Sequence, residues 1–387
     1  MITTASRLNG IEEYYFSQKL KEIQQLNQQG KAIINLGIGN PDLPPHPDVV
    51  RALGEEAAKN NVHGYQSYIG AEILRTSLAK WYKEWYAVDL DPASEVLPLI
   101  GSKEGIMHLC MTYLNEGDEA LIPNPGYPTY KSAVKLAGGK CVEYDLVEEN
   151  NWAIDFDVLD RKDLSKVKLM WVNYPHMPTG ILPTKKTFEE LISFGKKNNI
   201  LICHDNAYSL IQNKNPMSIL SVDGAKDTAV ELNSLSKSHN MAGWRIGFLC
   251  GAKERINEVL RFKSNMDSGM FLPLQLAAAK ALTLSKDWFE TINNIYAKRK
   301  HRVLELLDAL DCSYSTQQGG LFIWAKVPKL YKDGYELSDK VLYEAGVFIT
   351  PGGIFGEAGN NFIRISLCSS EEIYETAIKK IKQLKAT

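Results

Sequence analysis

The chain has 387 residues, of which 44% are hydrophobic and 23% are charged, and its formal net charge is −2. This length exceeds what one simple core needs, so two domains are expected. The near-neutral charge argues against nucleic acid or an anionic membrane as the main partner, and no apolar run approaches the roughly 20 residues of a membrane span. The N-terminus lacks the apolar core of an export signal, the six cysteines form no C-x-x-C pair, and the seven histidines show no metal-ligand spacing. We therefore expect a cytoplasmic protein with reduced cysteines and no metal site.

From about residue 96 the chain alternates short apolar runs with amphipathic stretches. The apolar runs predict strands at residues 96–100, 119–122, 167–172, 200–204, 230–233 and 246–250. The amphipathic stretches between them predict helices at residues 105–114, 129–136 and 187–198. Strands that alternate with helices at this spacing indicate an α/β fold, with a mostly parallel central sheet between two layers of helices. Loops at the carboxyl ends of such strands build the site.

The last third of the chain predicts a second, smaller unit. The longest helical pattern, Ser285 to Leu310, suits a connection between domains. It is followed by α+β elements, namely strands at 321–325 and 362–366, a helix at 336–344 and a closing helix from Glu371. We expect residues 49–284 to form a large domain, and residues 1–48 together with 285–387 to form a small α+β domain.

The segment Ser234-Leu235-Ser236-Lys237-Ser238 places a lysine among small hydroxyl residues, with Arg245 eight positions later. Small neighbours admit a bulky cofactor, and serine hydroxyls can hydrogen-bond its oxygens. This context suits a lysine that forms a Schiff base with pyridoxal phosphate. The alternative is a solvated lysine on a polar loop, where most lysines lie.

Two loops after predicted strands offer binding groups. At Gly101–Gly105 a strand turns into a helix, whose N-terminal N–H groups and the Ser102 hydroxyl can hold a phosphate. The rigid turn Pro123–Pro128 projects Tyr127, whose ring can stack on a flat heteroaromatic cofactor. Each has an ordinary alternative, a plain strand-to-helix turn for the first and a packed loop tyrosine for the second.

Two charged residues stand in apolar strands. Asp205 ends the strand predicted at 200–204, where a carboxylate is costly unless it is paired. It could hold a pyridinium nitrogen protonated, while Tyr208 donates to a phenolate oxygen; the alternative for Asp205 is a helix cap. Arg364 lies within the last apolar strand, which suggests a fixed site for a carboxylate, with an interdomain salt bridge as the rival interpretation.

Together these segments resemble the fold-type I pyridoxal-phosphate enzymes, and among them the class I and II aminotransferases, over nearly the whole chain and in the same order. The turn at 101–105 is most similar to that of the diaminopimelate aminotransferase branch. The resemblance implies pyridoxal 5′-phosphate as cofactor and Lys237, Asp205 and Tyr208 as catalytic residues. It further implies a cofactor site that includes Ser102, Lys103, Tyr127, Ser234, Arg245 and, toward the neighbouring subunit's phosphate, Tyr65. Gly39 and Arg364 are implied for the substrate.

One position departs from the family pattern. The family usually has N-P-T-G where this chain has Met177-Pro178-Thr179-Gly180. That asparagine normally hydrogen-bonds the phenolic oxygen of the cofactor, whereas a methionine sulfur is only a weak acceptor. Either Tyr208 serves this oxygen alone, or His176 or a water replaces the missing donor.

The implied activity is ping-pong transfer of an amino group between an L-amino acid and a 2-oxo acid. The resemblance also implies a homodimer with shared active sites, to which Tyr65 and a segment around Ser268 contribute. One alternative is a carbon–sulfur β-lyase, which shares the fold and these residues. A pyridoxal-phosphate-binding regulator would need an added DNA-binding segment, and a nicotinamide-dependent enzyme would need an early G-x-G-x-x-G.

The specificity for a substrate side chain is harder to predict from the sequence. No arginine for a second carboxylate can be identified. Tyr14, Tyr15, Phe16 and Ile38 could line an apolar pocket, although packing is the more usual role for the first three.

Overall fold

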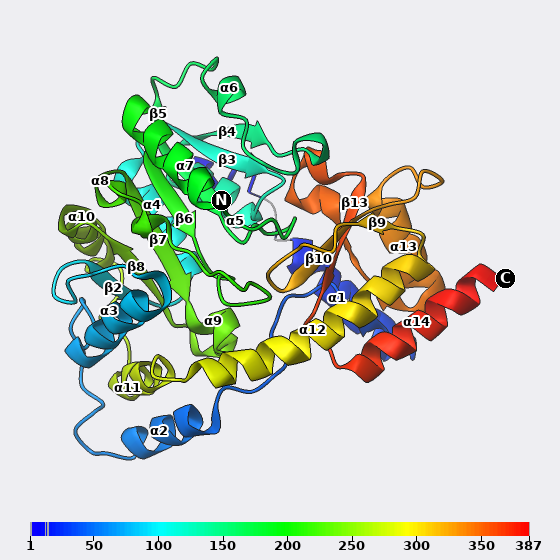
Figure 1. Ribbon diagram of the computed structural model, residues 1–387, viewed down its shortest axis with the longest axis horizontal. Coiled ribbons are helices and arrows are strands. Elements are labelled where there is room, and N and C mark those ends of the chain that lie inside the picture. Colours follow the sequence, from blue (N-terminus) through cyan, green and yellow to red (C-terminus); the bar gives the residue numbers. More distant parts are fainter. Residues whose placement is uncertain (1, 12, 14, 387) are drawn as a thin grey trace.

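The computed structural model describes residues 2–11, 13 and 15–386. Its largest element is a seven-stranded sheet with the order β2-β8-β7-β6-β5-β3-β4 (Figure 1). The strands are β2 (Val96–Leu99), β3 (Glu119–Asn124), β4 (Lys140–Asp145), β5 (Val167–Asn173), β6 (Leu201–Asp205), β7 (Ala229–Ser234) and β8 (Gly247–Gly251). Only β8 runs against the others, since it pairs antiparallel with both β2 and β7. The mostly parallel sheet predicted from the sequence is confirmed.

Apolar side chains cover both faces of this sheet and bury them under helices. One face packs against α4 (Ser102–Tyr113), α5 (Pro128–Leu136) and α10 (Lys253–Lys263). The other packs against α3 (Glu72–Tyr86), α7 (Lys185–Asn198) and α11 (Leu272–Ala281). The result is the predicted three-layer α/β/α arrangement, in which α2 (Pro47–Ala57) lies against α11.

A second core lies at the other end of the molecule and includes the second half of the long helix α12 (Lys286–Ala309), which runs into it from the region of the large sheet (Figure 1). An antiparallel sheet with the order β12-β13-β10-β9 forms its centre. Its strands are β9 (Ser313–Tyr314), β10 (Phe322–Lys326), β12 (Thr350–Pro351) and β13 (Phe362–Ser366). Helices α1 (Tyr15–Gln28), α13 (Gly334–Ala345) and α14 (Glu371–Ala386) pack around it.

Segments from both ends of the chain meet here, because β1 (Ile34–Asn35) pairs in parallel with β11 (Val347–Phe348). The domain boundaries placed after residues 48 and 284 stay a prediction.

The predicted elements agree with the structure to within three residues at each end, with the largest difference at the start of α4. The helix expected from residue 105 begins at Ser102, so the turn itself is the first turn of α4. Strand β4 was not predicted, because it is a partly exposed edge strand in which Lys140, Glu143 and Asp145 interrupt the apolar pattern.

In the part of the chain that the structure describes, no helix combines the length and apolarity needed to cross a bilayer. All six cysteines are free thiols, of which Cys141 is partly exposed and the others are buried.

Candidate active site

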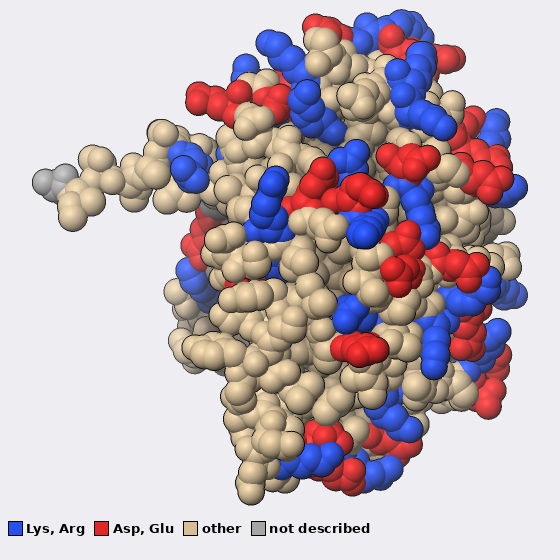
Figure 2. Space-filling model, turned by 90° about the vertical axis from the view of Figure 1, so that its left-hand side faces the viewer, with Lys and Arg blue, Asp and Glu red and all other residues tan. Residues whose placement is uncertain are grey.

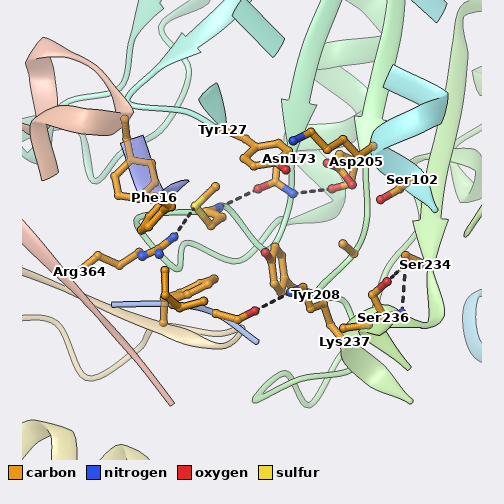
Figure 3. Close-up of a pocket in the computed structure, with 18 of the residues that line it drawn as sticks. Phe16, Ser102, Tyr127, Asn173, Asp205, Tyr208, Ser234, Ser236, Lys237 and Arg364 are labelled. Atoms are coloured by element: carbon orange, nitrogen blue, oxygen red, sulfur yellow. Dashed lines mark hydrogen bonds between the residues drawn. The ribbon is translucent and has the colours of Figure 1, made fainter. Parts of the chain in front are cut away.

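A cavity of about 600 Å³ lies where the carboxyl ends of β5, β6 and β7 face β10 and β13 (Figure 3). All predicted site residues except Tyr65 line it, namely Gly39, Ser102, Lys103, Tyr127, Asp205, Tyr208, Ser234, Lys237, Arg245 and Arg364. They come from opposite ends of the chain, so folding brings together groups that the sequence separates.

Asp205, the last residue of β6, presents a carboxylate that is only half satisfied. Its Oδ2 accepts a hydrogen bond of 3.0 Å from the hydroxyl of Tyr130. Its Oδ1 is buried and has no hydrogen-bond partner among the described residues. Burial raises the pKa of Asp205 to about 6, against the opposing effect of the Tyr130 hydrogen bond. A buried acceptor without a partner is costly, and a protonated ring nitrogen would satisfy it.

Lys237 lies in a short helix, α9 (Leu235–Ser238), directly after β7. Its Nζ donates a hydrogen bond of 2.6 Å to the carbonyl of Gly39. Burial lowers the pKa of Lys237, and the nearby positive charges of Arg364 and Arg245 lower it further. A lysine that loses its proton more readily is better suited to act as a nucleophile and base.

One end of the cavity gathers groups that bind anions. Helix α4 begins at Ser102, directly after Gly101, which has a φ of 85°. A Cβ on Gly101 would lie 2.2 Å from Nη2 of Arg245, so only glycine lets the arginine approach the start of the helix. Lys103 adds a further cation, whose pKa is lowered by burial and by Arg245. The N–H groups of a helix start, a hydroxyl and two cations match the chemistry of a phosphate.

Ser234 also lines this end, but its hydroxyl already has local partners. It caps α9 by accepting the N–H of Ser236 at 3.0 Å, and it donates to the carbonyl of Ile246 at 3.1 Å. Ser234 therefore fixes the segment that carries Lys237, besides facing the cavity.

Two predicted tyrosines lie at the middle of the cavity. The ring of Tyr127 meets Tyr130 edge to face at 5.6 Å, and Tyr130 stacks on Trp171 at 5.1 Å. The ring of Tyr208 lies 5.9 Å from that of Phe322, and burial raises the pKa of its hydroxyl. Tyr208 thus stays protonated and able to donate a hydrogen bond.

Arg364, on β13, lies at the opposite end of the cavity from the start of α4 (Figure 3). Its Nη2 donates to the carbonyl of Gly37 at 2.7 Å, and its Nη1 lies 3.2 Å from Sδ of Met177. Its guanidinium carbon lies 3.8 Å from the ring centre of Phe322 and 4.6 Å from that of Phe355. An arginine held among rings and a sulfur is weakly solvated, which strengthens its attraction for a carboxylate.

The structure also answers one question that Met177 raises. His176 is buried, and its Nδ1 lies 2.8 Å from the Thr179 hydroxyl. Burial lowers the pKa of His176 to about 3, and the residue does not line the cavity. His176 is therefore not placed to replace the missing asparagine.

Helix α1 contributes a wall of the cavity, of which the sequence offered only Phe16 as a candidate. Phe16, Ser17 and Leu20 line the cavity beside Ile38, and Phe16 also packs in the core as expected. The expectation for Ile38 is confirmed, Tyr15 packs against the neighbouring cores, and Tyr14 lies outside the described residues.

Two polar residues near Asp205 were also missed. Tyr130 lies in α5, where its periodicity is that of an ordinary core residue. Asn173 ends β5, donates to the carbonyl of Asp205 at 2.6 Å and accepts the N–H of Met177 at 2.7 Å. Its place at the carboxyl end of a parallel strand is the signal that could have identified it.

Comparison with known proteins agrees with this geometry. The family described as aminotransferase class I and II matches residues 31–381. An LL-diaminopimelate aminotransferase of Halothermothrix orenii is 41% identical over 380 residues, 98% of this chain and 97% of its own length. The corresponding Aquifex aeolicus protein is 39% identical over 387 residues and the whole of both chains. The structure of apo-BacF from Bacillus subtilis has a TM-score of 0.95 and 36% identity, over 99% of this chain and 98% of its own.

Proposed function

Since the chain belongs to the class I and II aminotransferases, a family that uses pyridoxal phosphate, and is itself such a transferase, we propose that pyridoxal 5′-phosphate binds in the cavity with Lys237 as its point of attachment. The unpartnered Oδ1 of Asp205 is the observation that carries the proposal. Because Asp205 is buried, that oxygen calls for a hydrogen-bond donor, and a protonated ring nitrogen would supply one. The matched family gives no support to the β-lyase or to the regulator.

The other predicted residues divide by position. The start of α4 with Ser102, Lys103 and Arg245 would hold the phosphate, and Ser234 would support the Lys237 segment. Tyr127 would stack on the ring, and Tyr208 would donate to the phenolic oxygen.

These residues also define a path for the proton. Bound pyridoxal phosphate supplies an electron sink and a carbonyl carbon that carries the amino group between the two substrates. Arg364 fixes the α-carboxylate of the substrate, and Gly39 lines the cavity with its carbonyl turned to Lys237. Nζ of Lys237, as the neutral amine, removes the α-proton of the amino donor. In the second half of the reaction the same nitrogen donates a proton to the α-carbon derived from the 2-oxo acid. Asp205 stays ionised and holds the proton on the ring nitrogen.

For the substrate side chain we favour an uncharged, largely apolar group. Phe16, Leu20, Ile38 and Phe355 line the cavity beside Arg364. Among the described residues of the lining, Asp205 is the only carboxylate, so a second ammonium group on the substrate finds no anionic partner there. The relatives named LL-diaminopimelate aminotransferase make that diamino acid the alternative to test.

We propose a homodimer, because one predicted cofactor residue does not reach the cavity of its own chain. Tyr65 is 94% exposed, and the segments 65–73 and 266–271 carry further exposed apolar side chains, namely Tyr68, Ile73, Met266 and Phe271. Phe271 stacks on His63 at 5.7 Å, which places the two segments side by side. Figure 2 shows that charged side chains are sparse in the lower left part of this face, whereas its upper and right-hand parts carry many. Such a surface suits a second copy of the chain.

Two further proposals concern location and architecture. We propose that the protein is cytoplasmic, because all six cysteines are free thiols and the cytoplasm keeps thiols reduced. We also propose that residues 49–284 are the large domain, and that residues 1–48 and 285–387 are the small one, since most of their buried apolar residues belong to separate clusters.

A panel of amino donors tests the function directly. L-phenylalanine, L-leucine, L-aspartate and LL-diaminopimelate are each supplied with 2-oxoglutarate or pyruvate, and the new amino and 2-oxo acids are measured. We expect the apolar donors to give the highest kcat/KM. Preference for LL-diaminopimelate would assign the relatives' activity, and a 2-oxo acid formed without any amino acceptor would indicate a lyase.

A further inference from the structure

An ion pair near the proposed carboxylate site joins the buried Arg299 to Asp42, whose side chain is 36% exposed. Arg299, on α12, has only 5% of its side chain exposed. Its Nη1 and Nη2 lie 2.6 and 2.8 Å from Oδ1 and Oδ2 of Asp42, which is the two-pronged geometry that an arginine makes with a carboxylate. The same Nη1 donates to the carbonyl of Leu367 at 3.1 Å. One guanidinium therefore joins the loop of residues 36–42 to the segment that follows β13.

The loop of residues 36–42 carries the carbonyl groups that hold Arg364 and Lys237. In the loop, the carbonyl of Gly37 accepts Nη2 of Arg364 at 2.7 Å, and the carbonyl of Gly39 accepts Nζ of Lys237 at 2.6 Å. The segment held through Leu367 begins three residues after Arg364 itself. We call the contacts of Arg299 with Asp42 and Leu367 the clasp. It links the loop that holds Arg364 and Lys237 to the segment that follows Arg364.

The loop of residues 36–42 is tightly packed, so it cannot shift without moving the residues of the site. A Cβ on Gly39 would lie 2.1 Å from the ring of Phe322, and one on Gly37 would lie 2.4 Å from the ring of Phe348. The loop therefore packs with its backbone directly against aromatic rings, and its carbonyls can serve the cations only while it keeps this path.

We propose that Arg299 is a positioning residue for amino transfer. By binding Asp42 it fixes the loop of residues 36–42, whose carbonyls at Gly37 and Gly39 then keep Arg364 and Lys237 in the positions that the reaction needs. Arg299 does not touch the cavity, since it is absent from its lining, and it acts only through the loop. The inference rests on the proposed roles of Lys237 and Arg364.

The clasp needs an arginine because a lysine offers one point charge where two parallel N–H groups are required. Arg299→Lys keeps the charge and loses the second bond, whereas Asp42→Asn keeps the size and loses the charge. In both variants kcat/KM is expected to fall by roughly tenfold to a hundredfold, the cost of a small misplacement of reacting groups. KM should rise because Arg364 is displaced from the substrate carboxylate, and kcat should fall because Lys237 is displaced from the α-proton. Both changes should be of similar size for every amino donor. In the double variant the two losses should not add, because either change opens the same clasp.

Arg302 provides a matched control. It lies three residues further along α12, is partly exposed, and pairs with Glu305 at 3.0 Å and Glu375 at 3.1 Å. Arg302→Ala should leave kcat and KM per folded enzyme unchanged.

A second measurement on cofactor-free protein separates positioning from overall stability. In the wild type the N–H of Leu36 is bonded to the carbonyl of Phe348 at 2.9 Å and that of Gly37 to Oδ1 of Asn35 at 3.0 Å, so amide hydrogen exchange at these two residues should be slow. Arg299→Lys should accelerate exchange at these residues selectively, whereas Arg302→Ala should not.

Variants with a lower Tm but unchanged kcat, KM and local exchange would overturn the proposal and leave Arg299 a structural ion pair. Because exchange is measured without cofactor or substrate, its outcome stands even if the wild type fails to transaminate. Such a failure would count against the proposed function alone.

Discussion

Sδ of Met177 lies 3.2 Å from Nη1 of Arg364, so the residue that replaces the family's asparagine contacts the proposed carboxylate site. Its backbone N–H is meanwhile bonded to Oδ1 of Asn173 at 2.7 Å. The loop thus keeps its shape through the backbone, while the side chain offers the arginine a soft acceptor and gives the cofactor no donor.

We expect Met177→Asn to lower the pH at which the cofactor's absorption changes, by up to about one unit, because a donated hydrogen bond favours the ionised phenolic oxygen. Spectral titration of the holoenzyme measures this shift. Met177→Leu, which is similar in size and also lacks a donor, is the control and should titrate like the wild type. Superimposable curves for Met177→Asn would mean that Tyr208, alone or with a water, already satisfies this oxygen.

Lys237→Ala should retain the cofactor but lose transamination by several orders of magnitude, because no other base is placed to move the α-proton. In the wild type, borohydride should fix the cofactor on Lys237, and peptide mapping identifies the modified residue. Lys103 lines the same cavity but should carry no adduct, so the Lys103→Ala variant should still be modified on Lys237. A reduced adduct on Lys103 would refute the site assignment.

Tyr65→Phe should weaken cofactor binding in the neighbouring subunit, if the exposed Tyr65 reaches that subunit's phosphate. When Tyr65→Phe and Lys237→Ala proteins are mixed, hybrid dimers should form one site free of both changes and regain part of the activity. Sedimentation at assay concentration measures the oligomer directly. Full activity in a monomer would contradict shared sites.

Arg364→Ala should reduce kcat/KM for every amino donor alike, since it contacts the α-carboxylate that all of them share. Truncating one partner of a buried charge pair costs roughly 2–5 kcal/mol. The donor panel measures this loss, and the ratio between donors should barely change. A loss confined to one donor would place Arg364 at a side-chain carboxylate.

The sequence predicted the central sheet and the polar ends of the cavity better than its walls. Lys237, Asp205 and Ser102 stand at strand or helix ends, where local pattern and parallel topology determine where a side chain goes. Phe16 could not be assigned, because an apolar residue in an amphipathic helix has the same local signal whether it meets the core or a cavity. The clasp between Asp42 and Arg299 joins residues 257 positions apart, and no local pattern encodes such a pairing.

The last prediction concerns the stability of the cofactor-free protein and follows from the buried carboxyl of Asp205. Burial raises its pKa from 3.8 to about 6, so the folded state holds the proton more tightly than the unfolded chain. Ionised Asp205 therefore destabilises the fold. The penalty is absent below about pH 4, grows as the pH rises between the two pKa values, and is complete above the folded-state value.

Asp205→Asn removes this charge and keeps the size of the side chain. In urea unfolding without cofactor, the variant should be more stable than the wild type at pH 8 by about 3 kcal/mol, the equivalent of a pKa shift of about two units. The difference should shrink toward zero near pH 4. With cofactor present the order should reverse, because only the carboxylate pairs with a protonated ring nitrogen. A pH-independent difference in the cofactor-free proteins would mean that Asp205 is already satisfied by groups of its own chain.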